Sequence, residues 1–264
     1  MQTTGFGFKG WVQVAAALLL CGSSQAAEWT PLSPQSPPEN EGATRLCSAE
    51  NIWCASVETS KRGGLALTVE RSSWTQPETI LVDAEEYEIN EVELWPQIYE
   101  VGPDQILVGV VVTQTTSYSG GGGSADWLSL YSVAALDELE AKEVLHVPMS
   151  SGIEIRACFD EEDVEKRLSV CHDQYDFTGS LDLAKGETVP GDMPDLVYAT
   201  VATSFPGPVS RTADSTTAPA LTEADLVKVE NETCTYQRTY WFDTASGSYK
   251  PDTPEPECAE FTVP

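Results

Sequence analysis

Positive charge is scarce in this chain. Lysine and arginine together number 14, against 42 aspartate and glutamate residues, which gives a formal net charge of −28. Nucleic acids and anionic membranes attract proteins through clustered basic side chains, so this balance argues against both as partners. The acidic excess favours solubility and cationic partners.

Signatures of known chemistry are missing as well. The sequence has no G-x-S-x-G turn for a hydrolase serine, no Cys-x-x-Cys pair for zinc and no calcium loop of the EF-hand type. It has two histidines, His146 and His172. His172 precedes Asp173, but neighbours in a strand point to opposite faces, which argues against a base and its orienting acid. We therefore nominate no catalytic residue, no cofactor and no metal ligand.

The first 26 residues have the three parts of a secretory signal peptide. Lys9 provides the charged start, an apolar stretch runs from Trp11 to Leu20, and small residues lead to a cut expected after Ala26. The apolar stretch is too short to span a bilayer, which needs about 20 apolar residues. We expect a periplasmic or extracellular protein without a membrane span. Cys21 leaves a lipid anchor as the alternative, although Leu20 is larger than the residue that normally precedes such a cysteine.

Removal of residues 1–26 leaves 13 basic against 42 acidic side chains, a net charge of −29, and an even number of cysteines. An even number in an exported chain indicates disulfides, although six cysteines allow about fifteen pairings. They form three couples that are close in sequence. The expected pairs are Cys47–Cys54, Cys158–Cys171 and Cys234–Cys258. The second pair has a difficulty, because alternation places Cys158 on a polar face and Cys171 on an apolar face. Either the strand register breaks before Gln174 or the pairing is different.

Short β-type runs separated by Gly, Pro, Asp and Ser predict an all-β protein with antiparallel strands, built as a sandwich, a barrel or irregular propeller-like sheets. A Pro-rich tether, 27–45, would precede one β-rich domain, 46–264, with a disulfide-held C-terminal strap. Two short helices are expected at Ala134–Glu143 and Asp160–Leu168, the second of which could equally be the polar tip of a hairpin. A flexible hairpin connection is expected at Gly120–Gly123. The expected strands are Ile52–Glu58, Leu65–Glu70, Thr79–Val82, Tyr87–Trp95, Gln105–Thr116, Trp127–Val133, Glu143–Pro148, Ile153–Phe159, Gln174–Leu183, Leu196–Ser204, Leu226–Glu230 and Cys234–Asp243.

Two groups of side chains are candidates for binding. Alternation places Trp241 on the more polar face of its strand, where an indole can stack on a sugar or anchor a protein partner. The alternative is that the strap Pro251–Cys258 covers it. Glu91 and Glu93 share one strand face and are suited to calcium or to acid–base work on a sugar. With so many acids in the chain, a solvated face is the alternative.

These patterns favour a non-catalytic binding module of the cell envelope or the extracellular space. Its recognition edge would include the segments Ser119–Asp126 and Phe205–Leu221. Its partner would be a cationic protein or a glycan. One alternative is an acidic antagonist of a cationic protein that attacks the envelope. The other is a hydrolase that uses two carboxylates, one with a raised pKa in an apolar cleft.

Overall fold

The computed structural model describes residues 28–35, 44–59, 64–73, 78–82, 90–135, 139–186, 189 and 191–264. The expected signal peptide lies outside these ranges, so its cleavage stays a prediction. Within the expected tether, residues 28–35 contribute two short strands that pair with the sheets.

Two antiparallel sheets, one of ten strands and one of five, account for most of the described chain, which confirms the expected all-β class. The strands are β1 (Thr30–Pro31), β2 (Ser33–Pro34), β3 (Leu46–Cys47), β4 (Trp53–Thr59), β5 (Leu65–Arg71), β6 (Glu78–Val82), β7 (Glu91–Gly102), β8 (Gln105–Tyr118), β9 (Gly121–Ala135), β10 (Leu139–Arg156), β11 (His172–Leu183), β12 (Leu196–Phe205), β13 (Val229–Glu230), β14 (Gln237–Asp243) and β15 (Ser248–Pro251). The helices are α1 (Glu161–Lys166) and α2 (Ala259–Thr262), with 3₁₀ turns η1 (Ala49–Asn51) and η2 (Glu223–Asp225).

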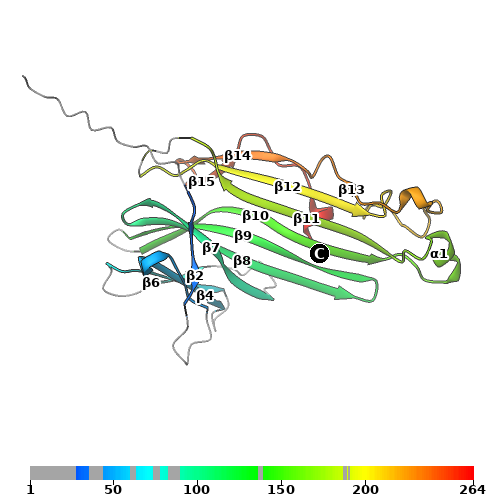
Figure 1. Cartoon of the computed structure of the whole chain (residues 1–264), viewed down its shortest axis with the longest axis horizontal. Helices are drawn as coiled ribbons and strands as arrows, with labels where there is room; N and C mark the ends of the chain where they lie inside the picture. The colour runs from blue at the N-terminus through cyan, green and yellow to red at the C-terminus, as the bar shows by residue number, and fades with distance from the viewer. Residues whose placement is uncertain are drawn as a thin grey trace, which may run out of the picture.

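In the large sheet, most strands lie beside the strand that precedes or follows them in the sequence. Its order is β1, β7, β8, β9, β10, β11, β12, β14 and β15, with β13 beside β12, and the small sheet runs from β2 through β6. The small sheet lies against one end of the large one (Figure 1). The segment Ile106–Val112 of β8 supplies buried side chains to the hydrophobic clusters on both of its faces, as its uninterrupted apolar run predicts.

The expected helix at Ala134–Glu143 is wrong. β9 continues to Ala135 and β10 begins at Leu139, with Leu139 opposite Ala135 and Ala141 opposite Val133. Alanine, leucine and glutamate favour helix locally, but pairing along these two long strands overrides that preference. The expected strand Glu143–Pro148 and the first part of the expected strand Ile153–Phe159 belong to the single strand β10, which has bulges after Glu143 and Pro148. β10 ends at Arg156, so Ala157–Phe159 lie outside it. The second expected helix is confirmed as α1, with Asp160 as its N-cap.

The glycine run was also assigned wrongly. The turn is confined to Ser119 and Gly120, and Gly121–Gly123 are paired residues of β9. A Cβ at Gly122 would lie 2.7 Å from the carbonyl oxygen of Thr116, and one at Gly123 would lie 2.7 Å from that of Gly152. The three strands therefore approach too closely here for any larger residue.

The disulfides join the cysteines as the local couples predict. S–S distances are 2.09 Å for Cys47–Cys54, 2.14 Å for Cys158–Cys171 and 2.09 Å for Cys234–Cys258. The difficulty over the second pair is removed because β10 ends at Arg156 and β11 begins at His172, so strand alternation applies to neither cysteine. The third disulfide fixes the C-terminal strap, and α2 places Phe261 edge-on to Tyr175 at 5.9 Å between ring centroids.

Candidate functional site

A hollow of about 620 Å³ opens where the small sheet meets the edge of the large sheet. One wall is β7, whose residues Glu91–Leu94 pair with β8 alone in the described chain, since β1 reaches only Gln97 and Ile98. The opposite wall is the end of β4, beyond its two-residue pairing with β3. In the described part of the chain, the edge of β7 at Glu91–Leu94 and the edge at the end of β4 therefore have no partner strand, and these two edges face one another.

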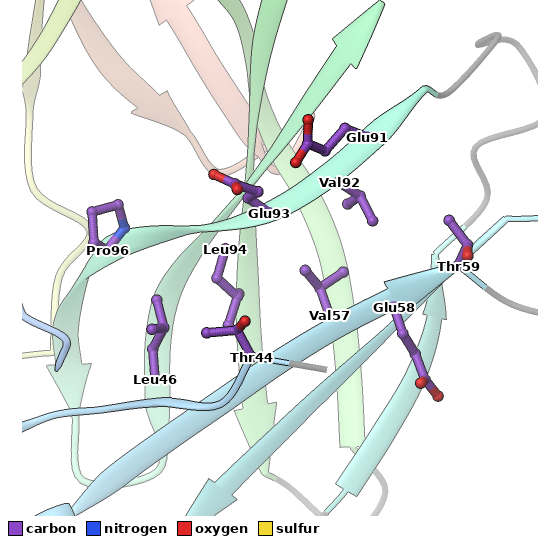
Figure 2. A pocket seen from close by; sticks show the side chains of 10 residues that line it. All are labelled: Thr44, Leu46, Val57, Glu58, Thr59, Glu91, Val92, Glu93, Leu94 and Pro96. Carbon is purple, nitrogen blue, oxygen red and sulfur yellow. The ribbon is translucent and has the colours of Figure 1, made fainter. Parts of the chain in front are cut away.

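The floor of this hollow, between the two strands, is apolar, and Thr44 and Thr59 also line the hollow. Val92 and Leu94 point from β7 toward β4, and Val57 points back from β4 (Figure 2). Leu46 completes this floor, and Pro96 lies farther along β7 than Leu94 (Figure 2). Leu46, Val57 and Leu94 are each about 8% exposed, so the floor belongs to the packed core and is held firmly.

Carboxylates line both lips of the hollow. Glu91 and Glu93 point away from the apolar floor on the other side of β7, and Glu58 does so on the other side of β4 (Figure 2). All three residues are exposed, which agrees with the solvated face proposed for Glu91 and Glu93. No lysine or arginine is found among the described residues that line it. The hollow therefore combines apolar depth with a negative rim.

Groups suited to acid catalysis or metal binding are not gathered at this rim. A general acid at neutral pH needs a carboxyl whose pKa is raised by an apolar site. Glu91 and Glu93 instead face solvent, and hydroxyl hydrogen bonds lower the pKa of Asp214, Asp225 and Asp243 elsewhere. In the described ranges, no three histidine, cysteine or acidic side chains are placed to hold a metal ion.

Ser129 and His146 form a contact that the sequence did not suggest. They lie directly opposite one another on β9 and β10, and the Ser129 Oγ is 2.8 Å from His146 Nδ1. The imidazole stacks on Trp127 with centroids 5.1 Å apart, and burial lowers its pKa, partly opposed by the nearby Glu143 charge. Ser129 is only 6% exposed, so this hydroxyl serves packing rather than attack on a substrate. The β10 bulge sets this register, and no sequence pattern reveals it.

Trp241 is uncovered, with 48% of its surface exposed. The alternative of burial beneath the strap Pro251–Cys258 is wrong, because the strap lies over the opposite, tyrosine-bearing face of β14. There Glu255 accepts a hydrogen bond from the Tyr240 hydroxyl, and Arg238 donates to the carbonyl of Pro254 at 3.4 Å. Trp241 stands opposite Lys250 of β15 on the outer face of the sheet. Its role in binding stays a prediction.

The two expected recognition segments differ in structure. Most of Ser119–Asp126 is strand β9, whereas Phe205–Leu221 beyond β12 is irregular. In that second segment, the Arg211 guanidinium donates to the carbonyls of Ala259, Glu260 and Val263 at 3.5, 3.1 and 2.6 Å. These contacts fasten the segment to the C-terminal strap.

Together these features define an antiparallel two-sheet protein with an acidic-rimmed apolar hollow. Comparison with protein-family models, with curated proteins and with solved structures finds no match to this chain. None of the helices in the described ranges has the length and apolar character to cross a bilayer.

Proposed function

We propose that this protein is a non-catalytic binding module that captures a cationic, amphipathic segment of another polypeptide in the hollow between β4 and β7. The observation that carries the proposal is the pairing of an apolar floor with carboxylates on both lips. An apolar side chain of the partner would rest on the floor formed by Val57 and Val92. Lysine or arginine side chains flanking it would meet Glu58, Glu91 and Glu93.

The charge of the whole molecule supports the same partner. A mature chain with 42 acidic and 13 basic side chains attracts cations over distances longer than a contact. Such steering raises association rates and weakens as salt screens it, with a Debye length of about 8 Å at physiological ionic strength. An acidic antagonist of a basic toxin, hydrolase or antimicrobial peptide would use this combination of steering and apolar capture.

The edge of β7 favours side-chain capture over addition of a strand. Exposed strand edges invite pairing with other chains, and proteins protect them with charges and proline. Glu91 and Glu93 supply charge at this edge, and Pro96 removes a backbone donor. Because these charges and this proline hinder the addition of a strand, we expect the partner to be held by its side chains rather than by backbone pairing with β7.

A peptide titration tests this function. Three short peptides of equal length would contain lysine with leucine, lysine with serine, or glutamate with leucine. Isothermal titration with the mature protein should show binding of the first peptide only, because it alone offers both cations and apolar side chains. Binding should weaken steeply as salt rises.

Paired variants locate the site. Glu91→Gln combined with Glu93→Gln should weaken binding of the lysine–leucine peptide about fivefold to tenfold through loss of local attraction. The matched control, Glu161→Gln with Glu165→Gln, removes the same charge from exposed positions on α1 and should change affinity less than about twofold. Equal binding of the lysine–serine peptide, or equal loss in both variants, would show diffuse electrostatics and overturn the proposal.

We further propose that the protein works outside the cytoplasm, for which the three disulfides are the supporting feature. Fractionation of cells expressing the full chain should recover a protein that begins at Ala27. Alkylation without reductant should find no reactive thiol. A cytoplasmic product that retains residues 1–26 would contradict the export proposal.

A further inference from the structure

A second hollow, of about 550 Å³, is lined by residues of β8, β9 and β10, the turn between β8 and β9, and the first residue of β11. These strand ends lie near α1, at the opposite end of the large sheet from the small sheet (Figure 1). The residues that line this hollow are mainly small and hydroxyl-bearing. They are Thr115, Thr116, Ser117, Tyr118, Ser119, Gly121, Gly122, Gly123, Ser124, Gly152, Glu154, Arg156 and His172. We propose that this groove binds the sugar rings of a glycan.

The floor of the groove is made of main chain. Gly121–Gly123 are the central strand, with Ser117 and Glu154 on either side of Gly122. On the neighbouring strand, a Cβ built on Gly152 would meet only a carboxylate oxygen of Asp176, at 3.9 Å. Gly122 and Gly123 are therefore required by close strand packing, whereas Gly152 leaves space above the sheet. That space is part of the groove.

The walls carry the groups that recognise sugars. His172 is exposed, and its imidazole ring can contact a pyranose ring and hydrogen-bond to its hydroxyls. Thr115, Ser117 and Ser124 can donate and accept hydrogen bonds with ring hydroxyls. No valine, leucine or isoleucine is among the described residues that line the groove, which argues against a wholly apolar ligand.

Arg156 gives the groove a fixed donor at one end. Its Nε donates to the carbonyl oxygen of Cys158 at 2.7 Å, and its guanidinium lies over the Phe159 ring, 4.9 Å from the centroid. In the part of the chain that the structure describes, Arg156 forms no ion pair. His172 stands directly opposite it in the strand register. The planar fork of arginine suits two adjacent oxygens of one sugar ring.

A glycan fits this groove better than an anionic polymer. Glu154 lines the groove, and the net charge of the chain repels polyanions such as nucleic acids. This groove is separate from the hollow between β4 and β7, so the glycan proposal and the peptide-binding proposal can fail independently. It is also separate from Trp241, whose strand, β14, is separated from β10 by β11 and β12.

Titration calorimetry with cellohexaose and chitohexaose tests the inference on the mature, oxidised protein, with the polyanion hexagalacturonate as a control. At least one of the two neutral oligosaccharides should bind, whereas hexagalacturonate should bind more weakly because the acidic chain repels it. Gly152→Val should weaken that binding at least about tenfold, because its side chain fills the open space above the sheet. Gly102→Val is the matched control, since a Cβ there has no atom within 4 Å. It should bind as the wild type does.

Two further variants keep the result interpretable if Gly152→Val does not fold. His172→Ala removes an exposed ring and Arg156→Gln removes the fixed donor, and each should weaken binding at least about fivefold with thermal unfolding little changed. The inference is overturned if neither neutral oligosaccharide binds at millimolar concentration, or if hexagalacturonate binds more tightly than both. It is equally overturned if a folded groove variant binds normally, or if Trp241→Ala abolishes binding that the groove variants retain.

Discussion

At the scale of single residues, the most consequential interaction is the ion pair between Arg167 and Asp173. Their side chains are 5% and 3% exposed, and the Ser215 hydroxyl also donates to Asp173. Arg167 Nε donates to the carbonyl of Val170 at 3.0 Å. The pair fixes the loop between α1 and β11. The sequence indicated only that Arg167 belongs to the basic end of a helix, because burial of the pair depends on the fold around it.

Asp173→Asn should be strongly destabilising. It leaves the Arg167 charge buried without a counter-charge, which costs about 3–5 kcal/mol of unfolding free energy. Asp176→Asn is the control on the same strand, because its partner Lys228 is 58% exposed and such pairs contribute less than about 1 kcal/mol. Urea unfolding of both variants measures the difference. Similar losses in the two would contradict the role of burial.

Trp241 is a residue-scale test of a different kind. Because about half of its surface is exposed, truncation to alanine removes little packing, and we expect Trp241→Ala to change the unfolding free energy by less than about 1 kcal/mol. Urea unfolding measures this change directly. A loss of about 3 kcal/mol or more would mean that the indole is a core residue in solution. The sequence correctly separated its face from that of Tyr240 but assigned the strap to the wrong side.

At the scale of elements, alternation and composition predicted most of the strands and the disulfide pairs. The predictions failed for segments whose structure depends on pairing with a neighbouring strand rather than on their own composition. Leu139–Glu143 is a strand because β9 runs beside it, and Gly121–Gly123 are strand residues because β8 and β10 press against them. The hollow joins strands about 35 residues apart in the sequence, so Glu91 and Glu93 were visible as a pair but Val57 was not visible as their neighbour.

The glycine strand gives a prediction about β9. A Cβ at Gly123 would lie 2.7 Å from the carbonyl oxygen of Gly152 and 3.0 Å from Ile153 Cα. Gly123→Ala must therefore push two strands apart, at a cost of about 1–3 kcal/mol. Gly152→Ala, which meets open space, should stay within about 0.5 kcal/mol of the wild type. Urea midpoints compare them, and tolerance of Gly123→Ala would mean that the strands are less closely packed than described.

At the scale of the whole molecule, buried tyrosines limit alkaline stability. Burial raises the pKa of Tyr198, Tyr240 and Tyr249, so the folded protein keeps them neutral when the unfolded chain ionises near pH 10. Stability from these groups is complete below about pH 10 and is lost as pH rises further. Each tyrosine that ionises adds a negative charge to an already acidic chain, and the resulting repulsion also lowers stability at high pH.

Tyrosinate absorbance measures this directly. The chain has nine tyrosines, and fully solvated tyrosines ionise near pH 10. The buried Tyr198, Tyr240 and Tyr249 should ionise at higher pH, only as the protein unfolds. Circular dichroism recorded in parallel should report unfolding at the same pH as the delayed absorbance. A single smooth titration of all nine near pH 10, with the fold intact, would contradict the burial of these rings.

The central claim is that a basic amphipathic peptide binds between β4 and β7, and an amide NMR titration of the mature protein tests it most directly. With the lysine–leucine peptide, the largest shifts should fall on Val57, Glu91, Val92, Glu93 and Leu94, with little change at the acidic α1. Shifts spread over all acidic surfaces, or none at these five residues under saturating peptide, would contradict the account.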